Sequence, residues 1–116
     1  MAAIEVMRGD VVLVDLDPAQ GAEKMGKRPC VVVQNNMGNE KSPNTIIVPA
    51  TNASGKKTYP FQVLLPKGEG GLQLDSIAGC EQIRVIDRTR IIKKLGTLSP
   101  SYISEIDNAI RISLAL

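Results

Sequence analysis

Four short polar segments of this sequence hold residue types that can bind a phosphate. A guanidinium presents a planar fork of donors that matches a phosphate through two parallel hydrogen bonds, and a hydroxyl or amide side chain adds a further donor. The segments are Arg8 with Asp10, residues 23–28 with Glu23 and Arg28, Thr51 with Asn52, and residues 75–84 with Gln82 and Arg84. Together these residue types are typical of an anion-binding face.

Several kinds of catalysis are excluded by composition. The sequence contains no histidine, which rules out Ser-His-Asp and Cys-His catalysis, histidine acid–base pairs and the common zinc sites. Cys30 and Cys80 lie far apart and have no partners at metal-ligand spacing. We therefore expect buried free thiols rather than a disulfide, and we expect no metal ion or other cofactor.

Length and charge set further limits. The 116 residues have the size of one domain, which we place at residues 1–116. A net charge of +2 does not by itself indicate a nucleic-acid binder, so a basic site needs local clustering. The first ten residues, MAAIEVMRGD, lack the apolar core of a signal peptide, and no stretch approaches the ~20 apolar residues of a membrane span. We expect a cytoplasmic protein that does not contact a membrane.

Most of the chain has the pattern of β-strands. In residues 11–16, Val12, Val14 and Leu16 alternate with Val11 and Leu13, which predicts a strand covered on both faces. Residues 35–44 are rich in turn formers and predict a loop. Further strands are predicted at residues 30–34, 45–51, 59–65, 76–80, 82–86 and 92–96.

The period changes near the C-terminus. From Tyr102 onward the apolar residues recur at helical spacing, after Ser99 as a suitable N-cap and Pro100 as a suitable first helical residue. With so few crossover helices, the strands must pair mostly antiparallel. We predict a β-rich fold: a small SH3-like barrel of five to seven mostly antiparallel strands with a C-terminal amphipathic helix.

Within this plan the polar residues have two readings each. On a strand, Gln82 and Arg84 are two positions apart and share a face, where they suit contacts to phosphates or base edges. Each candidate also has a purely structural reading. Arg8 and Asp10 can pair with neighbours, Gln82 and Arg84 can form a solvated face, and Thr51 can serve only as a β-former. Lys24, Lys27 and Arg28 can be charges of a solvated loop, and Lys56 and Lys57 can be an ordinary charged turn.

The order of the segments favours the functional reading. The stretches RGDVVLVDLDPAQGAEKMGKRPCVVVQN, IIVPAT and DSIAGCEQIRVIDRTRI, in this order, closely resemble the MazF/PemK/Kid family of toxin endoribonucleases. The resemblance runs from Arg8 to the final helix. It implies a PemK-type barrel, a homodimer, a MazE-like antitoxin as partner, and cleavage of single-stranded RNA without metal.

The resemblance also assigns roles by position. It places the catalytic arginine at Arg28, the catalytic threonine at Thr51 and an acidic loop residue at Glu23. Arg8, Gln82 and Arg84 match positions at or near the RNA groove, or among the residues that support it. Family members often have Gly-Gly before Arg-Pro, whereas this loop reads Lys24-Met25-Gly26-Lys27 and therefore gains two cations.

The implied reaction needs no metal if the ribose 2′-hydroxyl attacks the adjacent phosphorus and the 5′-oxygen leaves. Arginine has a pKa above about 12 and is a poor proton acceptor, so the base is Glu23, a deprotonated Arg28 or water. We favour Glu23, with Arg28 stabilising charge. We expect the rim loops to bind RNA through Lys24, Lys27, Asn52, Lys56 and Lys57.

Two other functions fit a similar architecture. One is a toxin of the same fold that acts on a protein target such as DNA gyrase, with its activity in the C-terminal helix and no ribonuclease activity. The other is an inactive RNA-binding module. The combination of Arg28 and Thr51 with Gln82 and Arg84 favours the ribonuclease.

Overall fold

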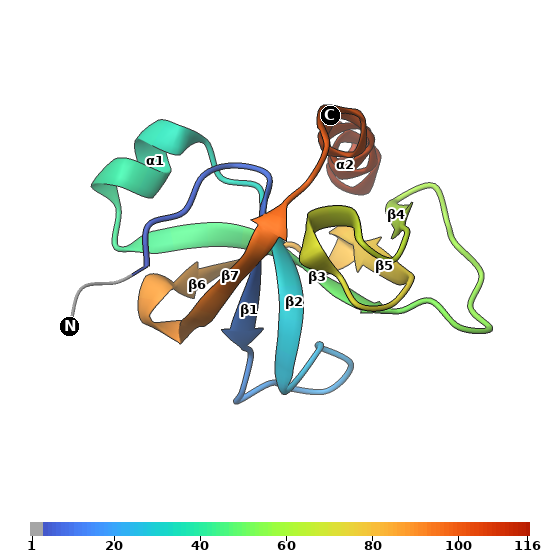
Figure 1. Cartoon of the computed structure of the whole chain (residues 1–116), viewed down its shortest axis with the longest axis horizontal. Coiled ribbons are helices and arrows are strands. Elements are labelled where there is room, and N and C mark those ends of the chain that lie inside the picture. Colours follow the sequence, from blue (N-terminus) through green and yellow to red (C-terminus); the bar gives the residue numbers. More distant parts are fainter. Residues whose placement is uncertain (1–3) are drawn as a thin grey trace.

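The computed structural model describes residues 4–116, and within this range seven strands pair antiparallel in one sheet (Figure 1). Residues 1–3, the start of the segment in which we expect no signal peptide, lie outside the described residues. The strands are β1 (Asp10–Asp15), β2 (Lys27–Val32), β3 (Asn44–Asn52), β4 (Gln62–Leu65), β5 (Ser76–Gly79), β6 (Arg84–Asp87) and β7 (Ile91–Thr97). The helices are α1 (Asn36–Lys41) and α2 (Pro100–Leu114), with short 3₁₀ turns at Glu69–Gly71, Cys80–Gln82 and Arg88–Arg90.

Strand β3 organises the sheet because it pairs with three others. The order is β4-β5-β3-β2-β1-β7, and β6 pairs with the first part of β3 while β5 pairs with its end. Figure 1 shows β3 running across the molecule, with β6 toward one end and β4 and β5 toward the other. The predicted β-rich fold of mostly antiparallel strands with a C-terminal helix is confirmed.

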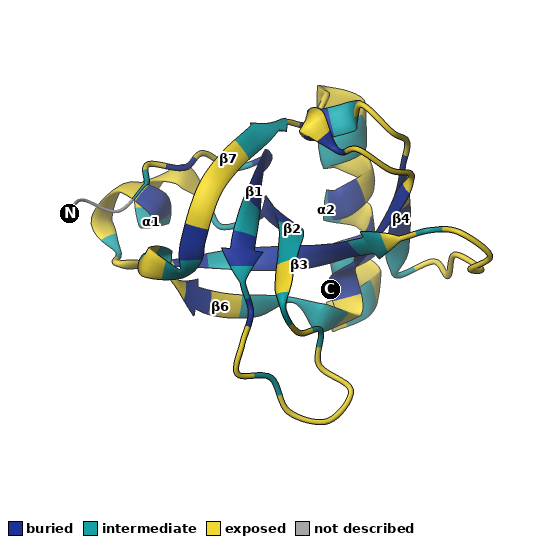
Figure 2. Cartoon of the chain, turned by 60° about the horizontal axis from the view of Figure 1, so that its bottom comes forward, coloured by how far each residue is buried: buried dark blue, intermediate teal, exposed yellow. Residues whose placement is uncertain are grey.

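The apolar residues of the central strands are buried, and Figure 2 shows β1 and β3 coloured mostly as buried. Val12, Val14 and Leu16 belong to one apolar cluster, and Val11 belongs to the other. This is the alternation that residues 11–16 predict, because successive side chains of a strand point to opposite faces. Strands β1 and β2 therefore form a rigid base for the loop between them.

Helix α2 covers one of the two clusters. Ile106 and Ala109 are buried in it, as the helical spacing predicts. Pro100 lies in the first turn, where its missing N–H has no helical partner to lose. Ser99 is the N-cap residue as predicted, although its side chain makes no capping hydrogen bond. No helix within residues 4–116 has the length and apolar character needed to cross a membrane.

Residues 35–44 contain helix α1, so the prediction of a loop was wrong there. The Asn35 side chain caps this helix by accepting a hydrogen bond from the Gly38 N–H at 2.8 Å. Asn39 is buried, and its Oδ1 accepts a hydrogen bond from the Thr45 hydroxyl at 2.7 Å. These side-chain bonds stabilise a short helix whose composition alone predicts a turn.

Two strands begin three residues away from the predicted position. Strand β2 begins at Lys27 rather than at Cys30, since Lys27 and Arg28 pair with Asp15 and Val14 of β1. Strand β4 begins at Gln62 rather than at residue 59. The segment 59–61 instead belongs to the long exposed connection after β3, which projects to the right in Figure 1.

Candidate active site

Arg28 and Thr51 come from the ends of neighbouring strands. The pairs Cys30 with Pro49, Val31 with Val48 and Val32 with Ile47 define the register between β2 and β3. Continuing that register by two residues places Arg28 opposite Thr51. Both side chains line one open pocket of about 500 Å³, together with Lys27 and Asn52. The fold thus brings four of the predicted site residues to one place.

The guanidinium of Arg28 is held from one side only. Its Nε donates a hydrogen bond to the Met25 carbonyl at 2.7 Å, and the side chain is half-buried. Within residues 4–116, its two terminal nitrogens and the Thr51 hydroxyl make no other hydrogen bond. These groups remain available to a ligand, and a guanidinium oriented through Nε can direct its terminal nitrogens at a phosphate.

The loop that carries Met25 is closed at its neck. Leu16 donates to the Gly26 carbonyl at 2.9 Å, and the Gly26 N–H donates to Asp17 Oδ1 at 3.0 Å. Arg90 donates from Nη1 to the carbonyls of Asp15, at 3.2 Å, and Asp17, at 2.6 Å. Asp17 and Arg90 therefore fix the strand ends from which Arg28 projects, a role that no local sequence pattern indicates.

Glu23 lies on the exposed part of this loop. Its Oε1 accepts a hydrogen bond from the Gln20 N–H at 2.6 Å, and it does not line the pocket shared by Arg28 and Thr51. The structure therefore does not place the predicted acidic residue beside the predicted phosphate ligands.

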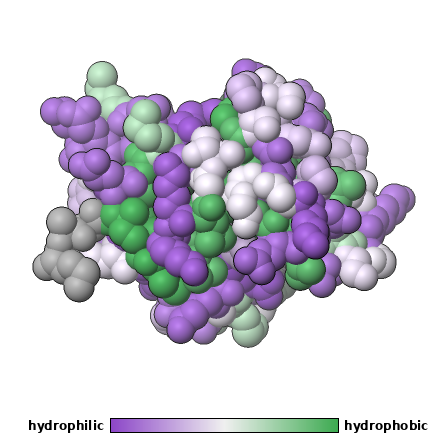
Figure 3. Space-filling view, viewed as in Figure 1, coloured by the Kyte–Doolittle hydropathy of each residue, from purple (hydrophilic) through white to green (hydrophobic). Residues whose placement is uncertain are grey.

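A second pocket adjoins the first and shares Thr51 with it. Its volume is about 300 Å³, and Lys24, Lys56 and Lys57 contribute to its walls. The connection 53–61, which carries two of these lysines, projects at the right of Figure 1, and Figure 3 shows hydrophilic side chains at that end of the molecule. Positive charge thus clusters next to the Arg28 pocket although the net charge of the chain is small.

The family is shown by a direct match. Residues 7–114 match the family described as the PemK-like, MazF-like toxin of type II toxin-antitoxin systems. The chain belongs to this family. It is 44% identical over 111 residues to the protein named endoribonuclease MazF from Staphylococcus epidermidis, covering 96% of this chain and 92% of that protein.

Solved structures share the fold of this MazF-like chain. The crystal structure of MazF from Deinococcus radiodurans has a TM-score of 0.83 at 24% identity, covering 97% of this chain and 99% of the other. An endoribonuclease in complex with its cognate antitoxin, from a mycobacterial species, has a TM-score of 0.79 at 22% identity and covers 96% of each chain. At these identities the structures support the fold only.

Gln82 and Arg84 of this MazF-like chain do not share a strand face, so that prediction was wrong. Gln82 ends the 3₁₀ turn Cys80–Gln82, and Arg84 begins β6 opposite Ile47. The turn changes the direction of the chain between the two residues, so their side chains do not follow the alternation of a continuous strand. Gln82 Oε1 accepts a weak hydrogen bond from the Lys24 N–H at 3.4 Å, so Gln82 supports the loop next to the second pocket.

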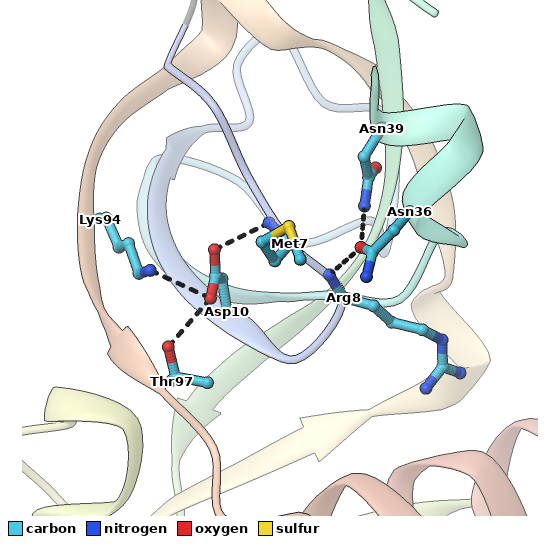
Figure 4. A network of polar contacts seen from close by, with 7 residues as sticks. All are labelled: Met7, Arg8, Asp10, Asn36, Asn39, Lys94 and Thr97. Carbon is cyan, nitrogen blue, oxygen red and sulfur yellow. Dashed lines mark hydrogen bonds and ion pairs between the residues drawn. The ribbon is translucent and has the colours of Figure 1, made fainter. Parts of the chain in front are cut away.

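Arg8 lies outside both pockets and is bound within the protein. Its Nη2 is 2.5 Å from Asp107 Oδ1, and its Nε donates to the Val33 carbonyl at 3.0 Å. Figure 4 shows its backbone N–H bonded to Asn36, with its side chain pointing away from buried Asp10. These contacts tie the segment before β1 to α2, which is the structural reading of Arg8.

Both cysteines are free and buried, as predicted. Burial raises the pKa of Cys30 to about 12, although the nearby charges of Arg84 and Arg28 lower it. Burial, with a smaller effect from Glu81, raises the pKa of Cys80 to about 12. Because the thiolate is the reactive form, neither thiol suits a nucleophile.

Proposed function

We propose that this chain is the toxin of a type II toxin–antitoxin pair and cleaves single-stranded RNA at a defined sequence. Membership in the MazF-like family and the 44% identity to an endoribonuclease support this function. The observation that carries it is the shared pocket of Arg28 and Thr51. A toxin that poisons DNA gyrase has no need of this pair and is not favoured.

In the proposed reaction the ribose 2′-oxygen forms a bond to phosphorus while the bond from phosphorus to the 5′-oxygen breaks. The products carry a 2′,3′-cyclic phosphate and a 5′-hydroxyl. Arg28 binds the non-bridging oxygens through its terminal nitrogens, and Thr51 donates its hydroxyl to the same phosphate. Preorganised donors of this kind stabilise the charge of the transition state, and the strongest of them contributes about 3–4 kcal/mol.

Two protons move in this step. The 2′-hydroxyl loses one, and the leaving 5′-oxygen gains one. We assign the first to Glu23, which lies outside the pocket of Arg28 and Thr51 in the free protein and needs a movement of its loop to accept the proton, directly or through a water molecule. We assign the second to the charged guanidinium of Arg28, which donates a proton to the leaving oxygen and regains one from solvent.

The same proposal includes the partners. RNA approaches through Lys24, Lys27, Asn52, Lys56 and Lys57, which surround the two pockets, while Gln82 and Arg84 support the groove. A homodimer lengthens that groove, and a MazE-like antitoxin occupies it and blocks RNA. The relative in complex with its cognate antitoxin supports this partner. The cytoplasm is the expected location, since messenger RNA and reduced thiols are found there.

The test is incubation of the purified protein with a long single-stranded RNA in the presence of a chelator. We expect cuts at a recurring short sequence and products with cyclic phosphate and 5′-hydroxyl ends, identified by sequencing and mass spectrometry. Ends with 5′-phosphate, or a requirement for a divalent ion, would contradict the proposed reaction.

A further inference from the structure

We propose that the pocket between the connection 53–61 and the end of β5 binds the nucleobase next to the scissile phosphate and selects bases that carry an amino group. These bases are adenine, cytosine and guanine, in contrast to uracil. The inference rests on the proposed ribonuclease function, because it assigns a base-recognition site to the same RNA.

The position of this pocket fits a base beside the cut. Thr51 lines both this pocket and the one that contains Arg28. A phosphate held between Arg28 and Thr51 therefore has an attached nucleoside at the entrance of the second pocket. The volume of about 300 Å³ is at the small end of the range for ligand pockets, which suits a single base rather than a helix or a peptide.

Tyr59 provides a surface on which a base can stack. It is 48% exposed, and its ring stacks on Phe61 with centroids 5.6 Å apart and planes 5° from parallel. Phe61 does not line the pocket, whereas Lys57 does. The Nζ of Lys57 lies 5.4 Å from the centroid of the Tyr59 ring. Phe61 therefore fixes the ring, and Lys57 covers it in the free protein.

A base can displace Lys57 from that ring. An exposed cation–π contact contributes less than the stacking of a base on an aromatic side chain. The displaced ammonium then remains within reach of the RNA backbone. Lys24 and Lys56 line the same pocket. The pocket therefore offers an aromatic ring to the base and ammonium groups to the neighbouring phosphates.

Glu81 supplies the group that reads the base edge. Its Oε2 accepts a hydrogen bond from Gln62 Nε2 at 2.9 Å, and Gln62 Oε1 accepts one from the Tyr59 N–H at 3.2 Å. Gln62 thereby connects the carboxylate to the connection that carries the stacking ring. Among residues 4–116, Glu81 Oε1 has no hydrogen-bond or ion-pair partner.

The carboxylate of Glu81 lies close against the backbone at the end of β5. A Cβ added at Gly79 would lie 2.7 Å from Glu81 Oε1, which is closer than real Cβ atoms come to an oxygen. Glycine at this position lets the carboxylate fold against the strand end and into the pocket. The hydrogen bond of Oε2 to Gln62 restricts the rotation of this carboxylate and leaves Oε1 for a ligand.

Base selection follows from the chemistry of a carboxylate. When ionised it only accepts hydrogen bonds, and adenine, cytosine and guanine each present an amino donor on the exposed edge. Uracil presents one N–H between two carbonyl oxygens, which repel the carboxylate. A well-placed base-edge contact of this kind discriminates about tenfold or more against the wrong base.

The experiment is cleavage of an RNA pool randomised around the cut site by the wild-type protein and by Glu81→Gln. The glutamine amide can donate as well as accept, so it tolerates uracil. We expect the wild-type protein to deplete uracil about tenfold or more at one position next to the cut, and Glu81→Gln to lose this depletion. Glu40→Gln, which makes the same charge change on α1, should keep the wild-type preference.

The outcomes separate the two proposals. If the wild-type protein does not cut RNA, the proposed function and this inference both fail. If it cuts and Glu81→Gln keeps the same base preference at every position, the inference fails while the ribonuclease function stands. If Glu81→Gln cuts too slowly to measure, the binding of oligonucleotides with a 2′-deoxy sugar at the cut site replaces the cleavage assay. The inference fails if both proteins discriminate equally between the amino bases and uracil.

Tyr59 gives an independent measurement at the same site. Tyr59→Ala should raise KM about tenfold through loss of stacking, and Tyr59→Phe should restore the wild-type KM because the ring alone carries the contact. If Tyr59→Ala leaves KM unchanged, the stacking part of the inference is wrong.

Discussion

Arg28 lies across from Thr51 when the register between β2 and β3 is continued beyond Cys30 and Pro49, and both side chains line one pocket. The two residues are far apart in the chain and belong to different strands. Their approach depends on β1 and β2 holding the entrance of the hairpin loop, because Arg28 itself pairs with Val14. This relationship leads to the following predictions.

Arg28→Ala should lower the cleavage rate by about 100- to 1,000-fold, because it removes the charged donor from the phosphate. Cleavage kinetics on an end-labelled RNA measure the effect. Arg111→Ala, which removes an exposed guanidinium from the last turn of α2, is the matched control and should cut at the wild-type rate. An unchanged rate in Arg28→Ala would remove Arg28 from the mechanism.

Thr51→Val should lower the rate by about tenfold or more, since the shape is kept and only the hydroxyl is lost. Thr51→Ser should retain most of the activity because it keeps the donor. Single-turnover kinetics separate this effect from RNA binding. Equal rates for the valine and serine variants would show that the hydroxyl does not act on the phosphate.

Asp17→Ala should lower kcat by roughly tenfold with a smaller effect on KM, because it opens the neck of the loop that positions Arg28. Asp17→Asn keeps an oxygen that can accept the hydrogen bond from the Gly26 N–H, and it should restore kcat. A loss of activity in both variants, or in neither, would argue against this positioning role.

Arg8→Ala should destabilise the fold by about 1–3 kcal/mol, because it breaks the bonds of a half-buried guanidinium to Asp107 and Val33. Urea denaturation measures this change. At a temperature where the variant is fully folded, kcat and KM should stay near the wild-type values. A rise in KM without loss of stability would instead favour the expected contact of Arg8 with RNA.

Stability should fall as the pH rises above about 9, because burial raises the pKa of Cys30 and of Cys80 from 9.0 to about 12. In this window the unfolded chain loses thiol protons that the native protein keeps, so the free energy of unfolding decreases. The double variant Cys30→Ala, Cys80→Ala should show a weaker alkaline decrease. Iodoacetamide at pH 8 should label both thiols only after unfolding.

Several features of this protein follow from short stretches of sequence. The alternation in residues 11–16 predicts a strand buried on both faces, and the helical spacing after Pro100 predicts α2. These patterns are local, because a strand or helix sets which neighbours share a face within a few residues. The order of the motifs also predicts the family, and the resemblance to that family indicates Arg28 and Thr51 as candidate catalytic residues.

Other features were not accessible from sequence. Helix α1 depends on a cap at Asn35 and on a buried bond between Asn39 and Thr45, while composition alone indicates a loop. The 3₁₀ turn before β6 separates Gln82 from Arg84, whereas the period of two assumes an uninterrupted strand.

The sequence by itself determined the class of fold, the family and the residue types available for phosphate chemistry. Only the tertiary structure decided that Arg8 is paired with Asp107, that Asp17 and Arg90 close the loop beside Arg28, and that Glu81 reaches Gln62. The physical reason is that these contacts join residues distant in the chain. Strand register and packing determine their distances, and no local pattern encodes them.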